Sequence, residues 1–127
     1  MILVQPEQLS NVWPKVHAWI QSALEYGQGD ENATDVLISI AVGRYLLFHE
    51  PDKFAIVAQV QSFPRQKVIT VLYLGGGDMD AIKQGIEEAK PWCKAQGITA
   101  FRVWGRKGWK RVLEMTEKGY ILQSEIL

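Results

Sequence analysis

The sequence of 127 residues contains few of the side chains that bind metals or form cross-links: one cysteine, Cys93, and two histidines. A lone cysteine excludes an internal disulfide, and this set is too small for a cysteine-rich zinc site. We therefore predict no metal site. The scarcity of cysteine is typical of proteins from a reducing compartment, and it predicts a cytoplasmic location.

The chain also lacks an excess of one charge and a long apolar run. Its 14 basic and 14 acidic residues balance, so it has no overall attraction for nucleic acid or for an anionic membrane. No apolar stretch approaches the roughly 20 residues needed to span a bilayer, and the N-terminal residues lack a signal-peptide pattern. We expect no membrane partner, and nucleic acid is disfavoured.

Apolar residues, in contrast, are plentiful: they make up 47% of the chain and include five tryptophans. At this length such a content suffices for one hydrophobic core without stabilising cross-links. The sequence therefore predicts a single domain over residues 1–127.

The spacing of the apolar residues near the N-terminus predicts a short strand at residues 1–4 and then a helix. Apolar side chains recur at helical spacing over residues 9–24. We expect Ser10 or Asn11 to cap this helix, because Pro14 then lies in the first turn, where proline is tolerated.

A second helix and three strands follow. Thr34 is the expected N-cap of the helix, and Gly43 stands where a glycine commonly ends one. The period then changes to that of strands, and these strands read as an antiparallel meander. Their predicted ranges are 45–49, 54–63 and 68–74.

The second half of the sequence begins with a glycine run, Gly75-Gly76-Gly77, directly before a long helix over residues 79–96. Pro91 lies inside that helix and should kink it. The remaining predicted elements are a strand at 98–104, a helix at 109–118 and a strand at 120–127. The fold class is α/β (α+β), a mixed and mostly antiparallel central sheet flanked by helices, in the order β-α-α-β-β-β-α-β-α-β.

This element order resembles that of the GNAT family of acetyltransferases. The strand, glycine run and long helix of residues 68–97 resemble the unit that binds acetyl-CoA in that family. Glu88 to Ile98, EAKPWCKAQGI, is similar to the end of its long helix, and Lys118-Gly119-Tyr120 is similar to the segment before its last strand. The resemblance implies acetyl-CoA as cofactor, held by Leu72, Leu74, Gly75, Gly76, Gly77 and Met79.

The sequence departs from the GNAT pattern at two positions that matter for chemistry. The loop GGGDMD has no arginine, and Asp78 and Asp80 place negative charge where a diphosphate would lie. The alternative is a tight strand-to-helix turn in which Asp78 caps the helix. Met115 stands where the family has its general acid, and a thioether cannot donate a proton.

No catalytic residue is therefore assigned from the sequence. Glu50, His49 and His17 are the candidates for a general base, although a histidine without a positioned partner is more often structural. Cys93, on the inner face of the long helix, is interpreted as a core residue.

A basic and tryptophan-rich stretch follows the predicted strand at 98–104. It is a candidate interface, and its residues are Trp104, Arg106, Lys107, Trp109 and Lys110. Tryptophan and arginine commonly anchor protein interfaces, which favours a protein partner or self-association. The same residue types also bind nucleic acid, and they occur equally on a solvated rim with the tryptophans packed inward.

A narrower resemblance is to small GNAT-like proteins of tailed bacteriophages and prophages. It rests on Val12-Trp13-Pro14, Phe63-Pro64, Leu74-Gly75-Gly76 and the stretch from Trp104 to Trp109. It implies phage structural proteins as partners and a place in the host cytoplasm or the virion. The sequence thus leaves open whether the chain is an enzyme. Our hypothesis is a degenerate GNAT-like, non-catalytic binding or virion-assembly protein; the alternatives are an acetyl-CoA-dependent N-acyltransferase with a non-standard active site and a nucleic-acid-binding accessory protein.

Overall fold

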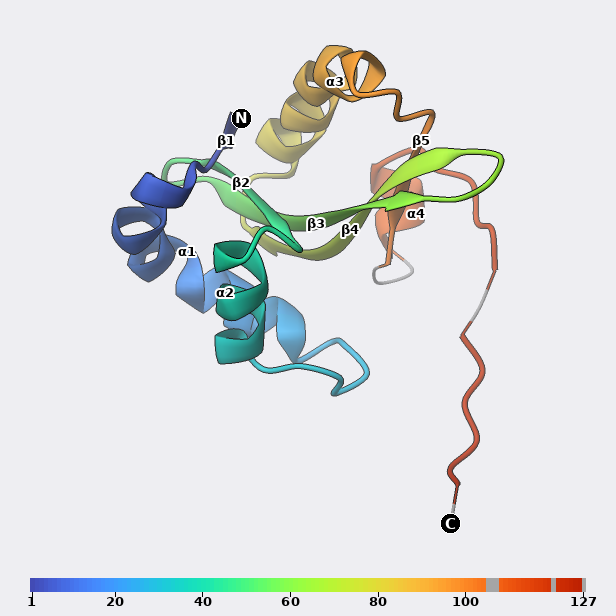
Figure 1. Ribbon diagram of the computed structural model, residues 1–127, viewed down its shortest axis with the longest axis horizontal. Helices are drawn as coiled ribbons and strands as arrows, with labels where there is room; N and C mark the ends of the chain where they lie inside the picture. The colour runs from blue at the N-terminus through green and yellow to red at the C-terminus, as the bar shows by residue number, and fades with distance from the viewer. Residues whose placement is uncertain (105–107, 120, 127) are drawn as a thin grey trace.

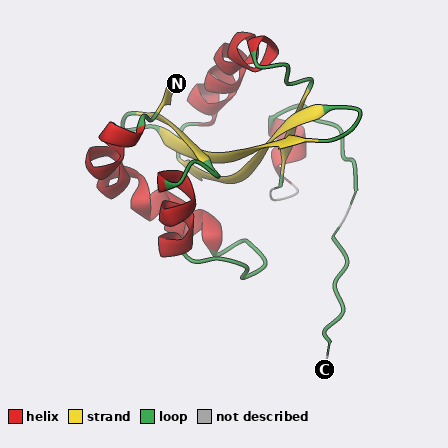
Figure 2. Cartoon of the chain, in the orientation of Figure 1, coloured by secondary structure: helices red, strands yellow, loops and turns green. Residues whose placement is uncertain are grey.

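The computed structural model describes residues 1–104, 108–119 and 121–126. A five-stranded sheet runs through the middle of the molecule, with helices on both sides (Figures 1 and 2). The elements are β1 (Ile2–Leu3), the 3-10 helix η1 (Pro6–Gln8), α1 (Leu9–Leu24), α2 (Ala33–Ala41), β2 (Leu46–Glu50), β3 (Phe54–Ser62), β4 (Lys67–Gly76), α3 (Met79–Ala95), β5 (Ala100–Val103) and α4 (Gly108–Val112).

The strands lie in the sheet in sequence order, β1-β2-β3-β4-β5. The pairs β1–β2, β2–β3 and β3–β4 are antiparallel, and the pair β4–β5 is parallel. The predicted meander is confirmed, and so is the mixed, mostly antiparallel α+β class. The parallel pair follows from the connection, because α3 carries the chain back across the sheet between β4 and β5.

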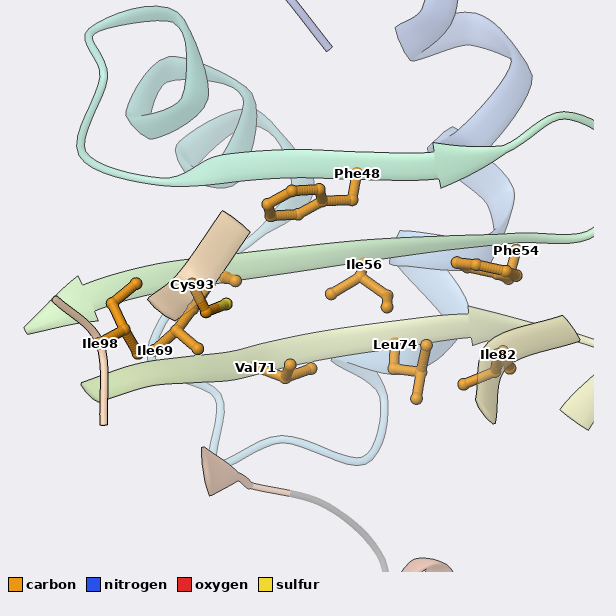
Figure 3. Close-up of a cluster of buried hydrophobic side chains, with 10 residues drawn as sticks. Phe48, Phe54, Ile56, Ile69, Val71, Leu74, Ile82, Cys93 and Ile98 are labelled. Carbon is orange, nitrogen blue, oxygen red and sulfur yellow. The ribbon is translucent and has the colours of Figure 1, made fainter. Parts of the chain in front are cut away.

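Each face of the sheet is covered by its own pair of helices. The face under α1 and α2 buries a cluster around Val16, Ile20, Val36 and Val57. The opposite face packs against α3 and α4; its core runs from Phe54 and Ile82 to Cys93 and Ile98 (Figure 3). We call these the α1/α2 face and the α3/α4 face. Cys93 is buried here, as predicted, and burial raises the pKa of its thiol.

Both N-terminal helices begin at residues other than those predicted. Neither Ser10 nor Asn11 caps α1, because η1 leads directly into it and Gln8 is the N-cap. Asn32 rather than Thr34 caps α2: its side chain accepts from the Asp35 amide, and the Asp35 carboxylate accepts from the Asn32 amide. Such a reciprocal box satisfies two amides that would otherwise lack partners.

The expected end of α2 is confirmed, whereas the kink expected at Pro91 stays a prediction. Gly43 follows α2 with φ of 82°, as a glycine that ends a helix should. Pro91 lies within α3, which runs unbroken from Met79 to Ala95 as one helix of 17 residues. None of the helices in the described part of the chain is long and apolar enough to cross a membrane.

The prediction of a final strand over residues 120–127 is wrong for residues 121–126, which have no regular structure; residues 120 and 127 lie outside the described residues. The helix before it is also shorter than predicted, since α4 ends at Val112 and Glu114 adopts a φ of 54°. A strand exists only where a neighbour completes its backbone hydrogen bonds. Sequence pattern alone cannot supply that neighbour.

Candidate functional site

The sheet opens where β4 and β5 part. The two strands pair from Val68 to Val71 of β4, and the Trp104 amide donates the last hydrogen bond, 3.2 Å long, to the Val71 carbonyl. Beyond that point Tyr73–Gly76 pair with β3 and, among the described residues, with no strand on the other side. The open edge of β4 therefore lies between the end of β5 and the start of α3.

A β-bulge lies at the start of this open edge. The register with β3 shifts between Val57 and Ala58, which oppose Tyr73 and Val71, so Leu72 is the extra residue. A bulge turns two consecutive side chains to one side of a strand. Leu72 and Tyr73 accordingly both pack on the α1/α2 face.

The bulge brings Tyr73 into a cluster with Glu31 and Tyr45. Glu31 lies in the loop between α1 and α2, and its two carboxylate oxygens each accept a phenol: Tyr45 at 2.6 Å and Tyr73 at 2.5 Å. Asn32, the adjacent N-cap of α2, fixes the backbone of this loop. We call Glu31, Tyr45 and Tyr73 the tyrosine–glutamate cluster.

Both phenols of the cluster are held in the protonated form. Burial is the largest cause, and the hydrogen bond to Glu31 is the next: together they raise the pKa of Tyr45 to about 12 and raise that of Tyr73 even further. The cluster therefore combines two phenolic protons with one carboxylate at the open edge of β4. It can bind a cation and can move a proton.

Sequence reasoning did not find this cluster. Tyr73 and Glu31 are 42 residues apart, and no sequence motif joins them. One signal was available: a tyrosine inside the buried run 68–74 requires a partner for its hydroxyl. The sequence does not show that this partner is Glu31.

The glycines predicted to bind the cofactor have packing reasons of their own. A Cβ on Gly75 would lie 2.5 Å from the Trp19 carbonyl oxygen of α1. Gly76 has a φ of 136°, and a Cβ there would collide with the Lys53 carbonyl. Around Gly77, in contrast, space is open. Gly77 is the one glycine of the run that neither packing nor a positive φ explains.

The start of α3 is acidic, as the sequence indicates. The Asp78 carboxylate caps the helix by accepting a 3.0 Å hydrogen bond from the Ala81 amide, and Asp80 is exposed beside it. Leu74 is buried in the α3/α4 core, and Met79 packs against that core. Asp78 therefore caps α3, as the alternative of a tight strand-to-helix turn predicts.

The candidate bases lie away from the cluster. His17 is exposed on α1, where it packs edge-on against Trp13, and Glu50 forms a 2.9 Å ion pair with the N-terminal amine. His49 lies on β2, four residues after Tyr45, which corresponds to about 13 Å in an extended chain. Burial lowers the pKa of its imidazole. The structure does not bring these three residues together with Tyr73.

The candidate interface residues divide into two environments. Trp104 is 56% exposed at the end of β5, and Lys110 forms an exposed ion pair with Glu117. Trp109 instead packs against the α3/α4 core. Arg106 and Lys107 lie outside the described residues. The described residues include no group of three or more histidine, cysteine and acidic side chains that could hold a metal ion.

Comparisons with known proteins reveal the fold but no close relative. No protein-family model matches the chain, and no curated protein matches it. Among solved structures, a probable acetyltransferase superposes with a TM-score of 0.68 at 12% identity, covering 99% of this chain and 98% of that one.

Two further solved structures superpose at a TM-score of 0.65, each covering 99% of this chain. A possible acetyltransferase from Clostridium difficile 630 is 11% identical, with 95% of its own chain covered. An aminoglycoside acetyltransferase from an uncultured soil metagenomic sample, in complex with sisomicin, is 9% identical, with 93% covered. The chain therefore has a GNAT-like acetyltransferase fold, as its element order predicts.

Proposed function

We propose that this chain is an N-acyltransferase that moves an acyl group from a CoA thioester to an amine. The observation that carries the proposal is the hydrogen bond from Tyr73 to Glu31 at the open edge of β4. A paired phenol and carboxylate supply the two proton-handling groups that acyl transfer requires. They do so in a fold shared with acetyltransferases, and in a chain whose Met115 cannot act as an acid.

The residues present fit an acyl-CoA in part. The open edge at Leu72–Gly76 offers backbone groups to an extended arm that contains amides, and Gly77 and Met79 begin α3 with room beside Gly77. Asp78 and Asp80 weaken this helix start as a diphosphate site. When bound, the thioester would supply an activated acyl carbon and a thiol leaving group.

Within the cluster, Glu31 and Tyr73 divide the proton transfers. Glu31 attracts the cationic amine, which must first lose one proton to solvent; Glu31 then takes the second proton as the neutral amine nitrogen bonds to the acyl carbon. Tyr73 Oη gives its proton to the departing sulfur, and the proton on Glu31 then passes to Tyr73 along their hydrogen bond. The products are an amide and a free thiol, and both side chains return to their starting states.

An amine acceptor suits the charge of this cluster. A half-buried carboxylate between two neutral phenols favours a cation over an anion. One structure with the same fold is an aminoglycoside acetyltransferase in complex with sisomicin. This likeness supports an amine as acceptor and says nothing about which amine.

The test is a measurement of free thiol released from acetyl-CoA with a panel of primary amines, polyamines and aminoglycosides. We expect turnover with at least one amine, and we expect Tyr73→Phe to lower kcat by about 10²–10³. Tyr26→Phe, at an exposed tyrosine, is the matched control and should leave kcat unchanged. Glu31→Gln should raise KM for a cationic amine as well as lower kcat.

Ligand binding is tested separately by thermal unfolding. Saturation with acetyl-CoA at about a hundred times its Kd stabilises a protein by about 2.7 kcal/mol, or roughly 8–15 °C at this size. The absence of both a shift at millimolar acetyl-CoA and thiol release would overturn the enzyme proposal.

A second candidate is a non-catalytic binding or assembly protein, of phage or prophage origin. It is favoured by the packing roles of Gly75 and Gly76 and by the cap that Asp78 provides, because these features account for the loop without a ligand. On this proposal acetyl-CoA produces no shift, and the exposed Trp104 edge binds a protein. A tight acetyl-CoA complex would argue against it.

A further inference from the structure

The C-terminal segment, residues 121–126, exposes large apolar side chains. Leu122 is 92% exposed, Ile126 is 96% exposed and Ile121 is 54% exposed. The segment extends away from the body of the molecule (Figure 1). Apolar side chains held in water at this density mark a surface that another surface covers.

The segment also has two distinct sides. Gln123 donates a 2.9 Å hydrogen bond to Glu125, so these polar side chains lie together as residues i and i+2 of an extended chain do. Leu122 and Ile126 share the alternate positions with Ser124. In an extended chain one side thus carries Leu122 and Ile126 around the small Ser124, and the other side carries Gln123 and Glu125 after Ile121.

The described part of β5 is a strand with one unfilled edge. It is the last strand of the sheet, and among the described residues it pairs with β4 alone. Such an edge presents a row of amides and carbonyls ready for another strand. Phe101 and Val103 of β5 pack toward the α3/α4 core, so one side of any added strand would be apolar.

Charge selects a register between these two strands. Arg102 lies on the other side of β5, where it covers the ring of Phe63 at 5.6 Å and lines a shallow hollow with it. An antiparallel pairing that sets Glu125 opposite Arg102 also sets Ile126 opposite Phe101 and Ser124 opposite Val103. One register therefore matches both the charge and the apolar side.

We propose that two copies of the chain exchange their C-terminal segments, each segment pairing antiparallel with β5 of the other copy. The segment leads away from its own β5 (Figure 1), so pairing within one chain would require it to reverse direction. In a dimer with a two-fold axis, the β5 edge of each copy pairs with the C-terminal segment of the other. Both edges and both segments then have hydrogen-bond partners, as in other domain-swapped dimers. The dimer extends the sheet across both copies.

The first test is the mass in solution, measured by light scattering during size exclusion. The wild-type chain should have twice its 14.4 kDa mass. Replacing Leu122 and Ile126 by aspartate should give a monomer with unchanged circular dichroism, because both side chains are exposed in the single copy. In wild type, hydrogen exchange of residues 121–126 should be slow, and it should become fast in the variant.

The decisive test is charge reversal with mixing. Arg102→Glu and Glu125→Arg each place like charges opposite one another in a homodimer, and each should raise the dimer dissociation constant about a hundredfold or more. An equimolar mixture of the two variants should regain the dimer, because every pair across the mixed interface is again opposite in charge. Pairing within one chain could not be restored by mixing.

Glu117→Arg is the matched control, because it makes the same charge change in the same region outside the exchanged segment. It should leave the dimer intact. A wild-type monomer at all concentrations, a dimer that survives the aspartate variant, or two reversal variants that stay monomeric when mixed would each overturn the proposal.

Discussion

The phenol of Tyr73 donates a 2.5 Å hydrogen bond to the carboxylate of Glu31, across 42 residues of chain. This contact joins the bulged end of β4 to the loop between α1 and α2. Tyr45 donates to the other oxygen of the same carboxylate, so one acidic side chain is shared by two phenols. The cluster is both a part of the core on the α1/α2 face and the chemical centre of the proposed site.

Titration of the tyrosines tests the cluster directly. An ordinary tyrosine ionises near pH 10, whereas the pKa of Tyr45 is raised to about 12 and that of Tyr73 is also raised. Phenolate absorbance should therefore show Tyr45 and Tyr73 ionising late. Glu31→Gln should lower both pKa values, but not to 10, because burial, the larger cause, remains.

The same shifts set a pH dependence of stability. Below pH 10 both phenols are protonated in the folded and unfolded chains, so the free energy of unfolding does not change on their account. As pH rises from 10 toward 12, the folded chain holds more protons than the unfolded one, and stability falls. Urea unfolding across this range should show a smaller fall in Glu31→Gln. An equal fall in both proteins would contradict the assignment.

The glycine run gives a comparison within three adjacent residues. Gly75→Ala and Gly76→Ala should each lower the free energy of unfolding by about 1–3 kcal/mol or more, because the added Cβ meets backbone atoms. Gly77→Ala has open space and should stay within about 0.5 kcal/mol of wild type. Urea unfolding followed by circular dichroism measures all three. Equal effects at Gly75 and Gly77 would refute the packing explanation.

The start of α2 is tested by a pair of asparagine variants. Asn32→Ala removes half of a capping box and should cost about 1 kcal/mol of unfolding free energy. Asn11→Ala, inside α1, removes no cap and should be neutral or slightly stabilising, since alanine favours helix. Chemical denaturation measures the free energy of unfolding of both variants. A loss of stability in Asn11→Ala alone would mean that Asn11 caps α1, as the sequence predicts, and that Asn32 does not cap α2.

Alanine substitutions of the two tryptophans in the candidate interface should differ in their effect on stability. Trp109→Ala removes a ring from the α3/α4 core and should cost roughly 2–4 kcal/mol, somewhat below the value for a fully buried ring. Trp104→Ala should change stability by about 0.5 kcal/mol at most, because its ring is largely exposed. If Trp104→Ala proved the more costly change, our placement of the two rings would be wrong.

Much of the fold was predictable because it is encoded locally. The β-branched and aromatic residues of 54–63 and the apolar run before Gly75 predicted β3 and β4, and helical spacing predicted α1 and α3. The ends of elements were less predictable, since η1 and Asn32 start helices that other residues could have capped as well. The sequence also predicted the acidic start of α3 and the burial of Cys93.

The site was less predictable than the fold. The sequence alone determined that the ordinary acid and the loop arginine are absent, because these are matters of residue type at a position. Only the tertiary structure decided that Tyr73 meets Glu31, since a bulge and a loop from distant parts of the chain set that contact. It also decided that residues 121–126 have no partner strand among the described residues: apolar alternation is local, whereas a strand needs a neighbour.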